Sequence, residues 1–444
     1  MISYSGKRKT LEDAEGEEDV FTRKRVLHCD HSSTKASEAN ESDLLTLLDL
    51  TSASSETDIH ERFEEIAEYL LSRRFQLVIR RHGLLEPDCE EEICYELLEI
   101  EFYLWKSGCH EDPFTHGSEE QRISGQWYFH RAPRKSNDSS RSQTSTTGYR
   151  GGTRKGLDLT LGGPAVESLK PPAATNSTSS RYFTNLDAPS ATDVLKPGSS
   201  PMANPPGHEL RGGILLRSMR RVDDGKIISG PSLLVDEILK QSAQHGSGTL
   251  TISELVGCKW GGNRSAFIFC GQEVPAPEQR LPVMFLRPVK SNAKDADPPI
   301  TPPIYSSPRI GLELSHPGTL PVSSHPRVRY LDRRYRYFVH PNLLTKNGRV
   351  QTFLGILDAV ISESSSFDPG IPGRARIQTV SKERISQLTG LTAACATNYL
   401  TYYLDGYDRG TLENFVGTAG KGASASPATY LRMMGTLVKM INGS

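Results

Sequence analysis

Apolar residues recur along the chain in blocks whose spacing predicts a mixture of helices and strands. Ile59, Phe63, Ile66 and Leu70 follow one another at the intervals of an amphipathic helix, and the apolar run from Phe75 to Ile79 predicts a strand. Further strands are predicted over 93–104, 127–130, 157–161, 213–218 and 334–339, and a helix that begins at a proline is predicted over 231–240. Beyond Pro341 the pattern becomes helical, over 350–362, 381–388, 392–404 and 428–441.

Segments poor in apolar residues divide the chain. Residues 1–58 are polar, acidic and rich in serine, which is typical of a disordered tail. Residues 132–147 are rich in Ser, Thr and Arg, residues 164–208 in Pro, Ser, Ala and Asn, and residues 291–307 in Pro, so we interpret all three as disordered insertions. The sequence therefore predicts an α+β domain over 59–341 and a helical extension over 342–444. That extension is either a packed, stabilising addition or a docking site for a partner protein.

The net charge of −1 hides an uneven distribution. Residues 1–60 carry 7 Lys/Arg and 13 Asp/Glu, a net of −6, so the remaining 384 residues carry a net of +5. A mildly basic body is compatible with a polyanionic partner but does not identify one. Lys7–Lys9 and Arg23–Arg25 form two basic clusters that could direct nuclear import, or could simply be solvated charges. The seven cysteines are irregularly spaced, which favours a reducing compartment, and no apolar run is long enough to span a membrane.

The predicted strand over 93–104 carries the most suggestive side chains. Its two-residue period places Glu99, Glu101 and Tyr103 on one face and Ile100 and Phe102 on the other. A carboxyl group among aromatic and apolar neighbours has a raised pKa and suits a general base near neutral pH. A half-exposed edge strand with solvated glutamates is the ordinary explanation of the same pattern.

Several other features could carry function, and some of them also have an ordinary structural explanation. The aromatic run from Trp127 to His130 suits stacking on a flat base or core packing. The loop Arg150–Gly156 suits a phosphate grip or a solvated turn, and Ser229–Gly230 begins a helix that could hold an anion. Arg217 is an arginine on an apolar strand, which predicts a bound carboxylate or phosphate. Cys89, Cys94, Cys109, His110 and His116 lack the spacing of a zinc site.

The order of these motifs resembles the alkyladenine (3-methyladenine) DNA glycosylase family. The family has a strand ending Glu-x-Glu-Ala-Tyr-Leu, which Glu99–Leu104 resembles, and then Asp-x-x-x-His, matched by Asp112–His116. Later family motifs resemble Gly125–His130, Leu215–Arg217 and Gly230–Leu234, and those near the domain end resemble Arg309–Gly311 and Arg336–Val339. The resemblance covers about 210 residues once the insertions are removed. It implies a single curved, mixed, mostly antiparallel sheet with packed helices.

The resemblance also implies roles for individual residues. Glu101 would activate water, and Arg217 would hold that water or an adjacent phosphate. The extruded base would lie among Tyr103, His116, Tyr128, His130 and Asp158, and the DNA backbone would contact Tyr149, Arg150, Arg154, Lys155, Ser229 and Gly230. His130 and Asp158 depart from the Tyr and Asn of the family. Because an ionised Asp only accepts hydrogen bonds whereas Asn also donates them, base selectivity is expected to differ.

The sequence thus predicts a monomeric, nuclear DNA repair enzyme that excises alkylated or deaminated purines from duplex DNA. No cofactor, no metal and no membrane partner are expected, while a protein partner for the C-terminal helices stays open. Two alternatives remain. One is a nucleic-acid binder that keeps the pocket without the chemistry, and the other is an enzyme acting on small nucleosides or nucleotides.

Overall fold

The computed structural model describes most of the chain beyond the first 40 residues. The described residues are 41–82, 90–115, 118–131, 155–164, 209–242, 265–267, 283–289, 301–344, 346–363 and 373–442. Both basic clusters near the N-terminus, most of the predicted insertions, and His116, Tyr149, Arg150 and Arg154 lie outside them.

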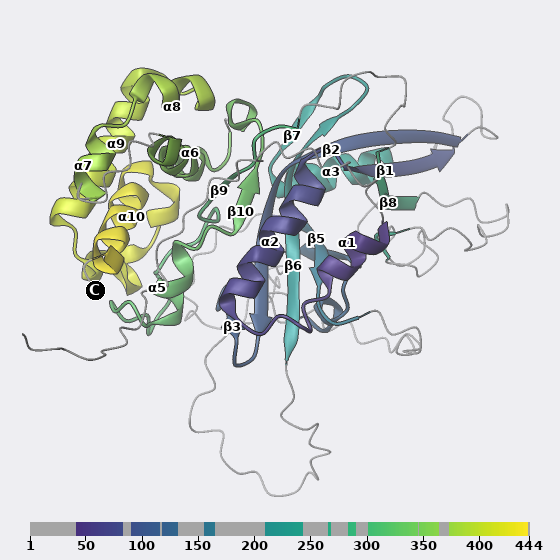
Figure 1. The fold of residues 1–444 in the computed structure, drawn as a ribbon, viewed down its shortest axis with the longest axis horizontal. Helices are drawn as coiled ribbons and strands as arrows, with labels where there is room; N and C mark the ends of the chain where they lie inside the picture. The colour runs from purple at the N-terminus through teal and green to yellow at the C-terminus, as the bar shows by residue number, and fades with distance from the viewer. Residues whose placement is uncertain are drawn as a thin grey trace, which may run out of the picture.

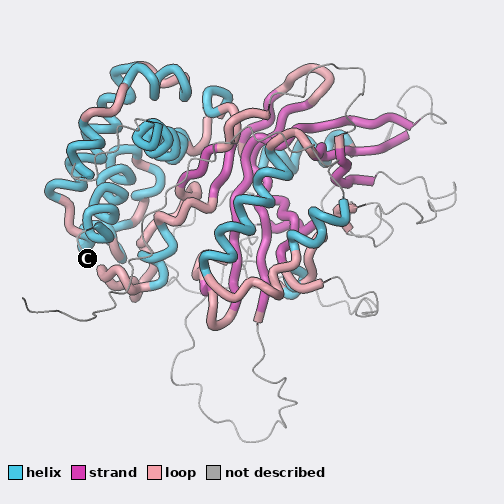
Figure 2. Tube along the Cα trace, in the orientation of Figure 1, coloured by secondary structure: helices cyan, strands magenta, loops and turns pink. Residues whose placement is uncertain are grey.

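One antiparallel sheet forms the centre of the molecule (Figures 1 and 2). Within the described residues its main path runs β4–β5–β6–β2–β1–β8, with four shorter strands added at the edges of β2, β6 and β10. The strands are β1 (Phe75–His82), β2 (Glu90–Lys106), β3 (His110–Glu111), β4 (Trp127–Arg131), β5 (Lys155–Leu161), β6 (Leu210–Arg221), β7 (Ile227–Ser229), β8 (Val283–Pro288), β9 (Tyr305–Ser307) and β10 (Arg336–Phe338). Parallel pairing occurs in the described chain at isolated bridges, so its named strand pairs are antiparallel rather than mixed.

The long strand β2 organises the sheet. It pairs with β6 along one edge, and with β1 and then β10 along the other. Its register with β6 shifts between Leu97 and Ile100, which marks a β-bulge. Bulges turn side chains and often lie beside functional sites. β2 is therefore an interior strand, and the alternative of an exposed edge strand is wrong.

Helices pack against the sheet. α1 (Glu41–Leu48) and α2 (Glu56–Leu71) lie on one face, where Phe63 of α2 stacks on Phe102 with ring centroids 4.2 Å apart. α2 begins with a capping box in which Ser55 and Asp58 satisfy each other's backbone N–H groups. α3 (Pro231–Gln241) packs against β5 and β6, and Tyr95 of β2 donates a hydrogen bond to its Glu237.

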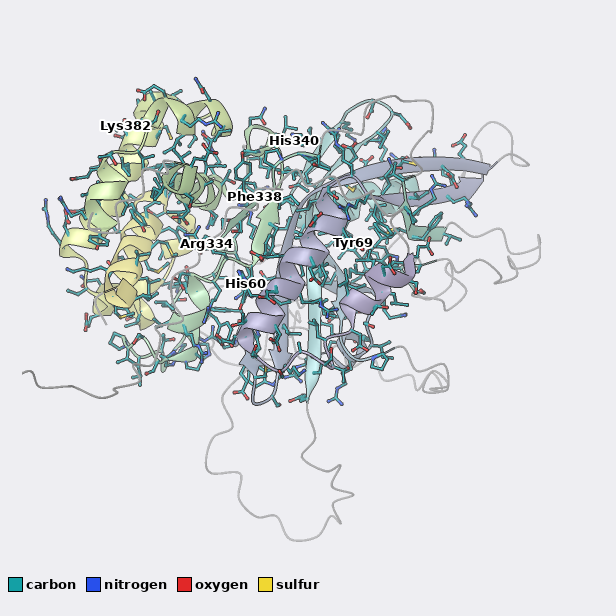
Figure 3. All side chains as sticks on the ribbon, in the orientation of Figure 1. His60, Tyr69, Arg334, Phe338, His340 and Lys382 are labelled. Carbon is teal, nitrogen blue, oxygen red and sulfur yellow. The ribbon has the colours of Figure 1, made fainter. Side chains whose placement is uncertain are left out.

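The C-terminal helices form a bundle beside the sheet (Figure 1). It consists of α6 (Arg349–Glu363), α7 (Gly373–Gln378), α8 (Lys382–Thr389), α9 (Ala393–Arg409) and α10 (Pro427–Asn442), and α5 (Pro326–Leu331) lies near it. Arg334, labelled in Figure 3 between the sheet and the bundle, forms an ion pair with Asp358 of α6. Thr352, Tyr399 and other residues of the predicted apolar faces are buried in this packing. The bundle is thus joined to the sheet by packing and by charge.

Most predicted elements are confirmed within a few residues of their predicted ends. The disordered tail predicted to reach residue 58 is wrong beyond residue 40, because α1 buries Leu44 and Leu48 completely. The predicted insertion 291–307 ends too late, since Tyr305–Ser307 forms β9. β8, α5 and α7 were not predicted from the sequence.

The crossing of α9 and α10 gives a test of this packing. A Cβ on Gly435 would lie 2.0 Å from the carbonyl oxygen of Tyr403, so no side chain fits there. In an open helix Gly→Ala stabilises by about 1 kcal/mol, whereas overpacking costs about 1–3 kcal/mol or more. We expect Gly435→Ala to lower the free energy of unfolding by at least about 1 kcal/mol in urea titrations. Thr401→Ala, on the exposed face of α9, should change it by less than about 0.5 kcal/mol. A stabilised Gly435→Ala variant would contradict the close crossing.

Candidate functional site

The side chains of β2 that point away from α2 form a buried polar cluster. Ile100 and Phe102 face the helices, whereas Glu99 and Glu101 face the opposite side, as the two-residue period predicts. Glu99 is 1% exposed and Glu101 is 0% exposed. Buried carboxylates are costly unless they are paired and hydrogen-bonded, so their partners define what the site can do.

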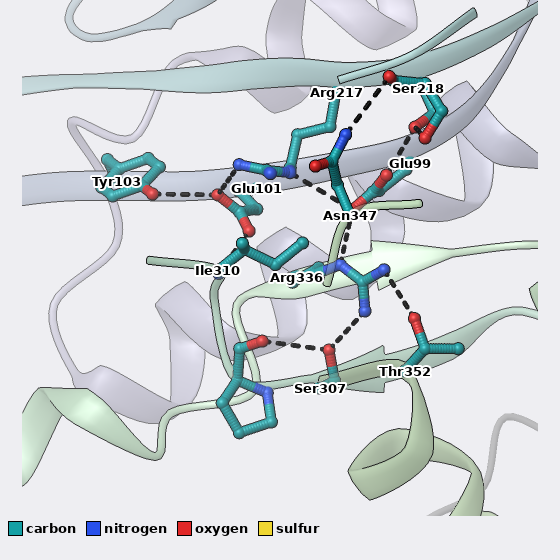
Figure 4. A network of polar contacts seen from close by, with 12 residues as sticks. Glu99, Glu101, Tyr103, Arg217, Ser218, Ser307, Ile310, Arg336, Asn347 and Thr352 are labelled. Carbon is teal, nitrogen blue, oxygen red and sulfur yellow. Dashed lines mark hydrogen bonds and ion pairs between the residues drawn. The ribbon is translucent and has the colours of Figure 1, made fainter. Parts of the chain in front are cut away.

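Three donors surround the carboxylate of Glu101 (Figure 4). Oε2 accepts from the Tyr103 hydroxyl at 2.9 Å and from Nη1 of Arg217 at 3.1 Å. Oε1 accepts from the backbone N–H of Ile310 at 2.7 Å. In all three contacts the carboxylate of Glu101 is the acceptor. Burial and the charge of Glu101 raise the pKa of Tyr103 well above its ordinary value, so its phenol stays a donor.

Arg217 lies between the two glutamates. Its Nε donates to Oε1 of Glu99 at 3.2 Å, while its Nη1 reaches Glu101. Burial lowers the pKa of Arg217, but Glu101 and Glu99 more than reverse this and leave it above its ordinary value. The bulge between β2 and β6 lies at these residues and turns Arg217 toward both carboxylates. The predicted pairing of Arg217 with a carboxylate is therefore present, with two of them.

Glu99 is held by a second arginine. Nε of Arg336, on β10, donates to Oε1 of Glu99 at 2.7 Å, and the Ser218 hydroxyl donates to Oε2 at 2.5 Å. Burial alone would raise the pKa of Glu99, but Arg336 and Arg217 lower it below its ordinary value. Arg336 and Glu99 are 0% and 1% exposed, so this ion pair is shielded from solvent.

A further buried ion pair joins Arg309 to Asp112, and both side chains are fully buried. Arg309 also donates to the carbonyl oxygens of Phe102 and Tyr330. Its guanidinium carbon lies 4.6 Å from the ring centroid of Tyr103, in a cation–π arrangement. One face of Tyr103 is therefore occupied, and a base stacked on this ring must use the other face.

Strand register extends the cluster across the sheet. Glu101 pairs with Leu215, Leu215 with Asp158, and Asp158 with Tyr128, and directly paired residues point to the same face. Two strand spacings separate the Cα atoms of Glu101 and Asp158 by roughly 10 Å. Leu215 and Tyr128 are each 8% exposed, and Asp158 is 2% exposed. Five of the predicted residues, Tyr128 and Asp158 with Glu101, Tyr103 and Arg217, thus share one face.

Gln121, in the short 3-10 helix Glu119–Arg122, completes this row and was missed from the sequence. Its Nε2 donates to Oδ2 of Asp158 at 3.2 Å, and its Oε1 is a buried acceptor without a hydrogen-bond partner. Gly213 makes the space, because a Cβ there would lie within 3.0 Å of both side chains. The Asp158 end of the row is therefore rich in hydrogen-bond acceptors.

Other predicted residues lie elsewhere or have other partners. The backbone of His130 pairs with Gly156. Lys155 forms an ion pair with Asp236 of α3, and its backbone N–H donates to the Ser232 hydroxyl. Ser229 is 7% exposed, and the N–H of Gly230 donates to the carbonyl of Arg217, so both residues stabilise the turn between β7 and α3.

Arg336, Arg309 and Asp112 were noticed as motif residues but not as members of the site. The signal that could have identified the two arginines is a lone guanidinium beside apolar or aromatic residues, the same signal that identified Arg217. Within the described part of the chain, no group of three or more His, Cys, Asp or Glu side chains could hold a metal ion. His110 hydrogen-bonds through its ring to the carbonyl of Leu104 and the hydroxyl of Tyr335.

Comparison with known proteins adds little to this geometry. No protein-family model matches the chain, and no solved structure matches it. The uncharacterized protein L759 of Acanthamoeba polyphaga mimivirus is 28% identical over 253 residues, which cover 57% of this chain and 79% of the viral protein. No described helix is both long and apolar enough to cross a membrane. The resemblance to alkyladenine DNA glycosylases therefore rests on sequence motifs alone.

Proposed function

We propose that this protein is a monofunctional DNA glycosylase that hydrolyses the N-glycosidic bond of alkylated or deaminated purines. The observation that carries the proposal is the environment of Glu101. This carboxylate is buried, bound by Tyr103, Arg217 and the N–H of Ile310, and in register across the sheet with Asp158. A carboxylate beside an arginine, with Asp158 roughly 10 Å away across two strand spacings, suits an extruded nucleotide.

The chemistry follows from the lone pairs of Glu101. A carboxylate offers about four acceptor positions. Three donors occupy three of them, which leaves about one for a water molecule. Such a water would donate its proton to Glu101 as its oxygen attacks the sugar carbon and the base departs. The same negative charge would stabilise the developing oxocarbenium ion, as a preorganised group does without further rearrangement.

Base recognition would occur at the other end of the row. The target base must leave the helical stack before its glycosidic bond can be reached. Tyr103 and Tyr128 supply aromatic surface, which attracts an alkylated, cationic purine. Asp158 and the free carbonyl oxygen of Gln121 present acceptors, so they favour a base edge that carries N–H donors.

A second function is favoured by one specific observation. Glu101 is 0% exposed and already has an arginine partner, which also suits a protein that binds nucleic acid without cleaving it. In that case duplex DNA would bind with an affinity that falls steeply as salt rises, and no base would be released. Release assays and binding assays on the same duplex therefore separate the two functions.

Substitution of Glu101 tests the catalytic proposal. Glu101→Gln keeps the size of the side chain and removes the charge, so single-turnover release of purines from alkylated duplex should fall by about 10²–10⁴-fold. Glu96→Gln is a matched control on the same strand, because Glu96 pairs with Arg220 and does not contact Glu101. Thermal unfolding of both variants checks that they are folded. If folded Glu101→Gln releases base as fast as wild type, the proposal fails.

Asp158 gives a separate test of base selectivity. Asp158→Asn adds an N–H donor. The release rate of bases that present a carbonyl or ring nitrogen should therefore rise relative to the release rate of bases that present N–H groups. One hydrogen bond of about 1.4 kcal/mol corresponds to a tenfold change in the ratio of release rates. The rates are measured on duplexes that each contain one modified purine. Asp224→Asn, half-exposed in the turn after β6, is the control. An unchanged ratio would mean that Asp158 does not contact the base.

A further inference from the structure

The C-terminal bundle is not separate from the candidate site. α6 packs directly on β9, and a Cβ on Gly355 of α6 would lie 2.6 Å from the carbonyl oxygen of Ser306. Three residues earlier on the same helix, Thr352 points its hydroxyl at Arg336 of β10. Thr352 is 2% exposed. The first helix of the bundle therefore reaches the buried charges through one polar contact.

Each side-chain nitrogen of Arg336 donates a hydrogen bond (Figure 4). Nη2 donates to Oγ1 of Thr352 at 2.9 Å, Nη1 donates to Oγ of Ser307 at 2.9 Å, and Nε donates to Glu99 at 2.7 Å. The guanidinium carbon also lies 4.3 Å from the ring centroid of Phe338. Since a guanidinium is planar and rigid, the hydroxyls of Thr352 on α6 and Ser307 on β9 fix the direction in which Nε donates to Glu99.

Arg336 and Arg217 compete for the same atom. Both donate through Nε to Oε1 of Glu99, Arg336 at 2.7 Å and Arg217 at 3.2 Å. Arg217 binds both carboxylates, because its Nε donates to Glu99 and its Nη1 donates to Glu101. The four side chains thus alternate in charge from the bundle to Glu101, and a change at one end alters how Arg217 is shared.

We propose that Arg336, oriented by Thr352 of the C-terminal bundle, is a positioning residue that sets how strongly Arg217 holds Glu101. This inference rests on the proposed function, in which Glu101 takes the proton from water. It makes the C-terminal bundle a component of the catalytic site, although the bundle contributes no group that touches the substrate.

The sign of the effect follows from the charges around Glu101. These charged and titratable groups are Glu99 and Tyr103 on β2, Arg217 on β6, Arg336 on β10, Arg309 after β9, Asp112 beside Arg309, Asp158 on β5 and Tyr430 on α10. Without the charge of Arg336, Glu99 attracts Arg217 more strongly, and the contact of Arg217 with Glu101 weakens. Glu101 then becomes easier to protonate. Without the charge of Glu99, Arg217 binds Glu101 alone, and Glu101 becomes harder to protonate.

The pH dependence of base release tests the proposal. A general base must be ionised, so activity falls below its pKa, and the position of this acidic limb reports on Glu101. Arg336→Met should move the limb up by about one pH unit, and Thr352→Val, which only removes the hydroxyl, should move it up by about half a unit. Glu99→Gln should move it down. Thr389→Val is the control, since the hydroxyl of this buried bundle threonine hydrogen-bonds to Ile385 and Leu391, which are close to it in the sequence and far from Arg336.

A second readout keeps the test independent of catalysis. In protein labelled with ¹³C at glutamate carboxyls, the Glu101 signal is assigned by its loss in Glu101→Gln, and its titration midpoint should shift as the limb does. Arg336→Met/Glu99→Gln together should restore the midpoint toward wild type, which covers the case where Arg336→Met alone does not fold. Midpoints that are equal in wild type, Thr352→Val and the Thr389→Val control overturn the inference, whether or not the protein releases bases. Shifted midpoints without base release uphold the positioning and overturn the proposed function.

Discussion

The structure depends on a cluster of buried ion pairs, in which the charges of Arg336, Glu99, Arg217 and Glu101 alternate in sign. Their exposed fractions are between 0% and 8%, so water does not stabilise these ions. Removing one member of such a pair typically costs about 3–5 kcal/mol, because an unpaired charge stays buried. Apolar residues of similar size would stabilise the sheet at least as well. Stability alone therefore does not explain why these charges are buried.

Two features of the backbone bring these ion-paired side chains together. The alternation of β2 gives its apolar side chains to α2 and its carboxylates to the other face, so one strand serves both the core and the site. The bulge at Leu97–Ile100 then brings Arg217 and Ser218 of β6 against Glu99. Since β10 pairs with β2 through Arg336–Glu101 and Phe338–Glu99, the opposite edge supplies the second arginine. Long-range strand pairing, rather than any local motif, assembles these groups.

The sequence predicted the parts that depend on local pattern. The period of β2, the helix containing Phe63 and the four longer C-terminal helices all follow from the spacing of apolar residues, and the structure confirms them. It did not predict that Glu101 is enclosed, because burial of a polar residue is decided by partners far away in the sequence. Arg336, Ile310 and Thr352 lie more than 200 residues from Glu101, and the oxygen of Glu101 is held partly by a backbone N–H that no pattern can reveal. α1 was missed for a related reason: its short apolar pattern lies in an acidic, polar stretch.

The two buried glutamates have different neighbours, and this difference bears on the choice between catalysis and simple binding. A glutamate that served only to neutralise Arg217 would be best satisfied with every acceptor position filled by protein. Glu99 and Glu101 each accept three hydrogen bonds from the protein, so they differ in the kind of donor: two arginines and the Ser218 hydroxyl bind Glu99, whereas one arginine, the Tyr103 hydroxyl and the Ile310 N–H bind Glu101. Glu101 is also the glutamate that contacts Tyr103 and lies in register, through Leu215, with Asp158, the residue that the proposed function places beside the base. The two acids therefore differ in position: Glu99 lies between two arginines, and Glu101 is the acid that the proposed function places beside the substrate.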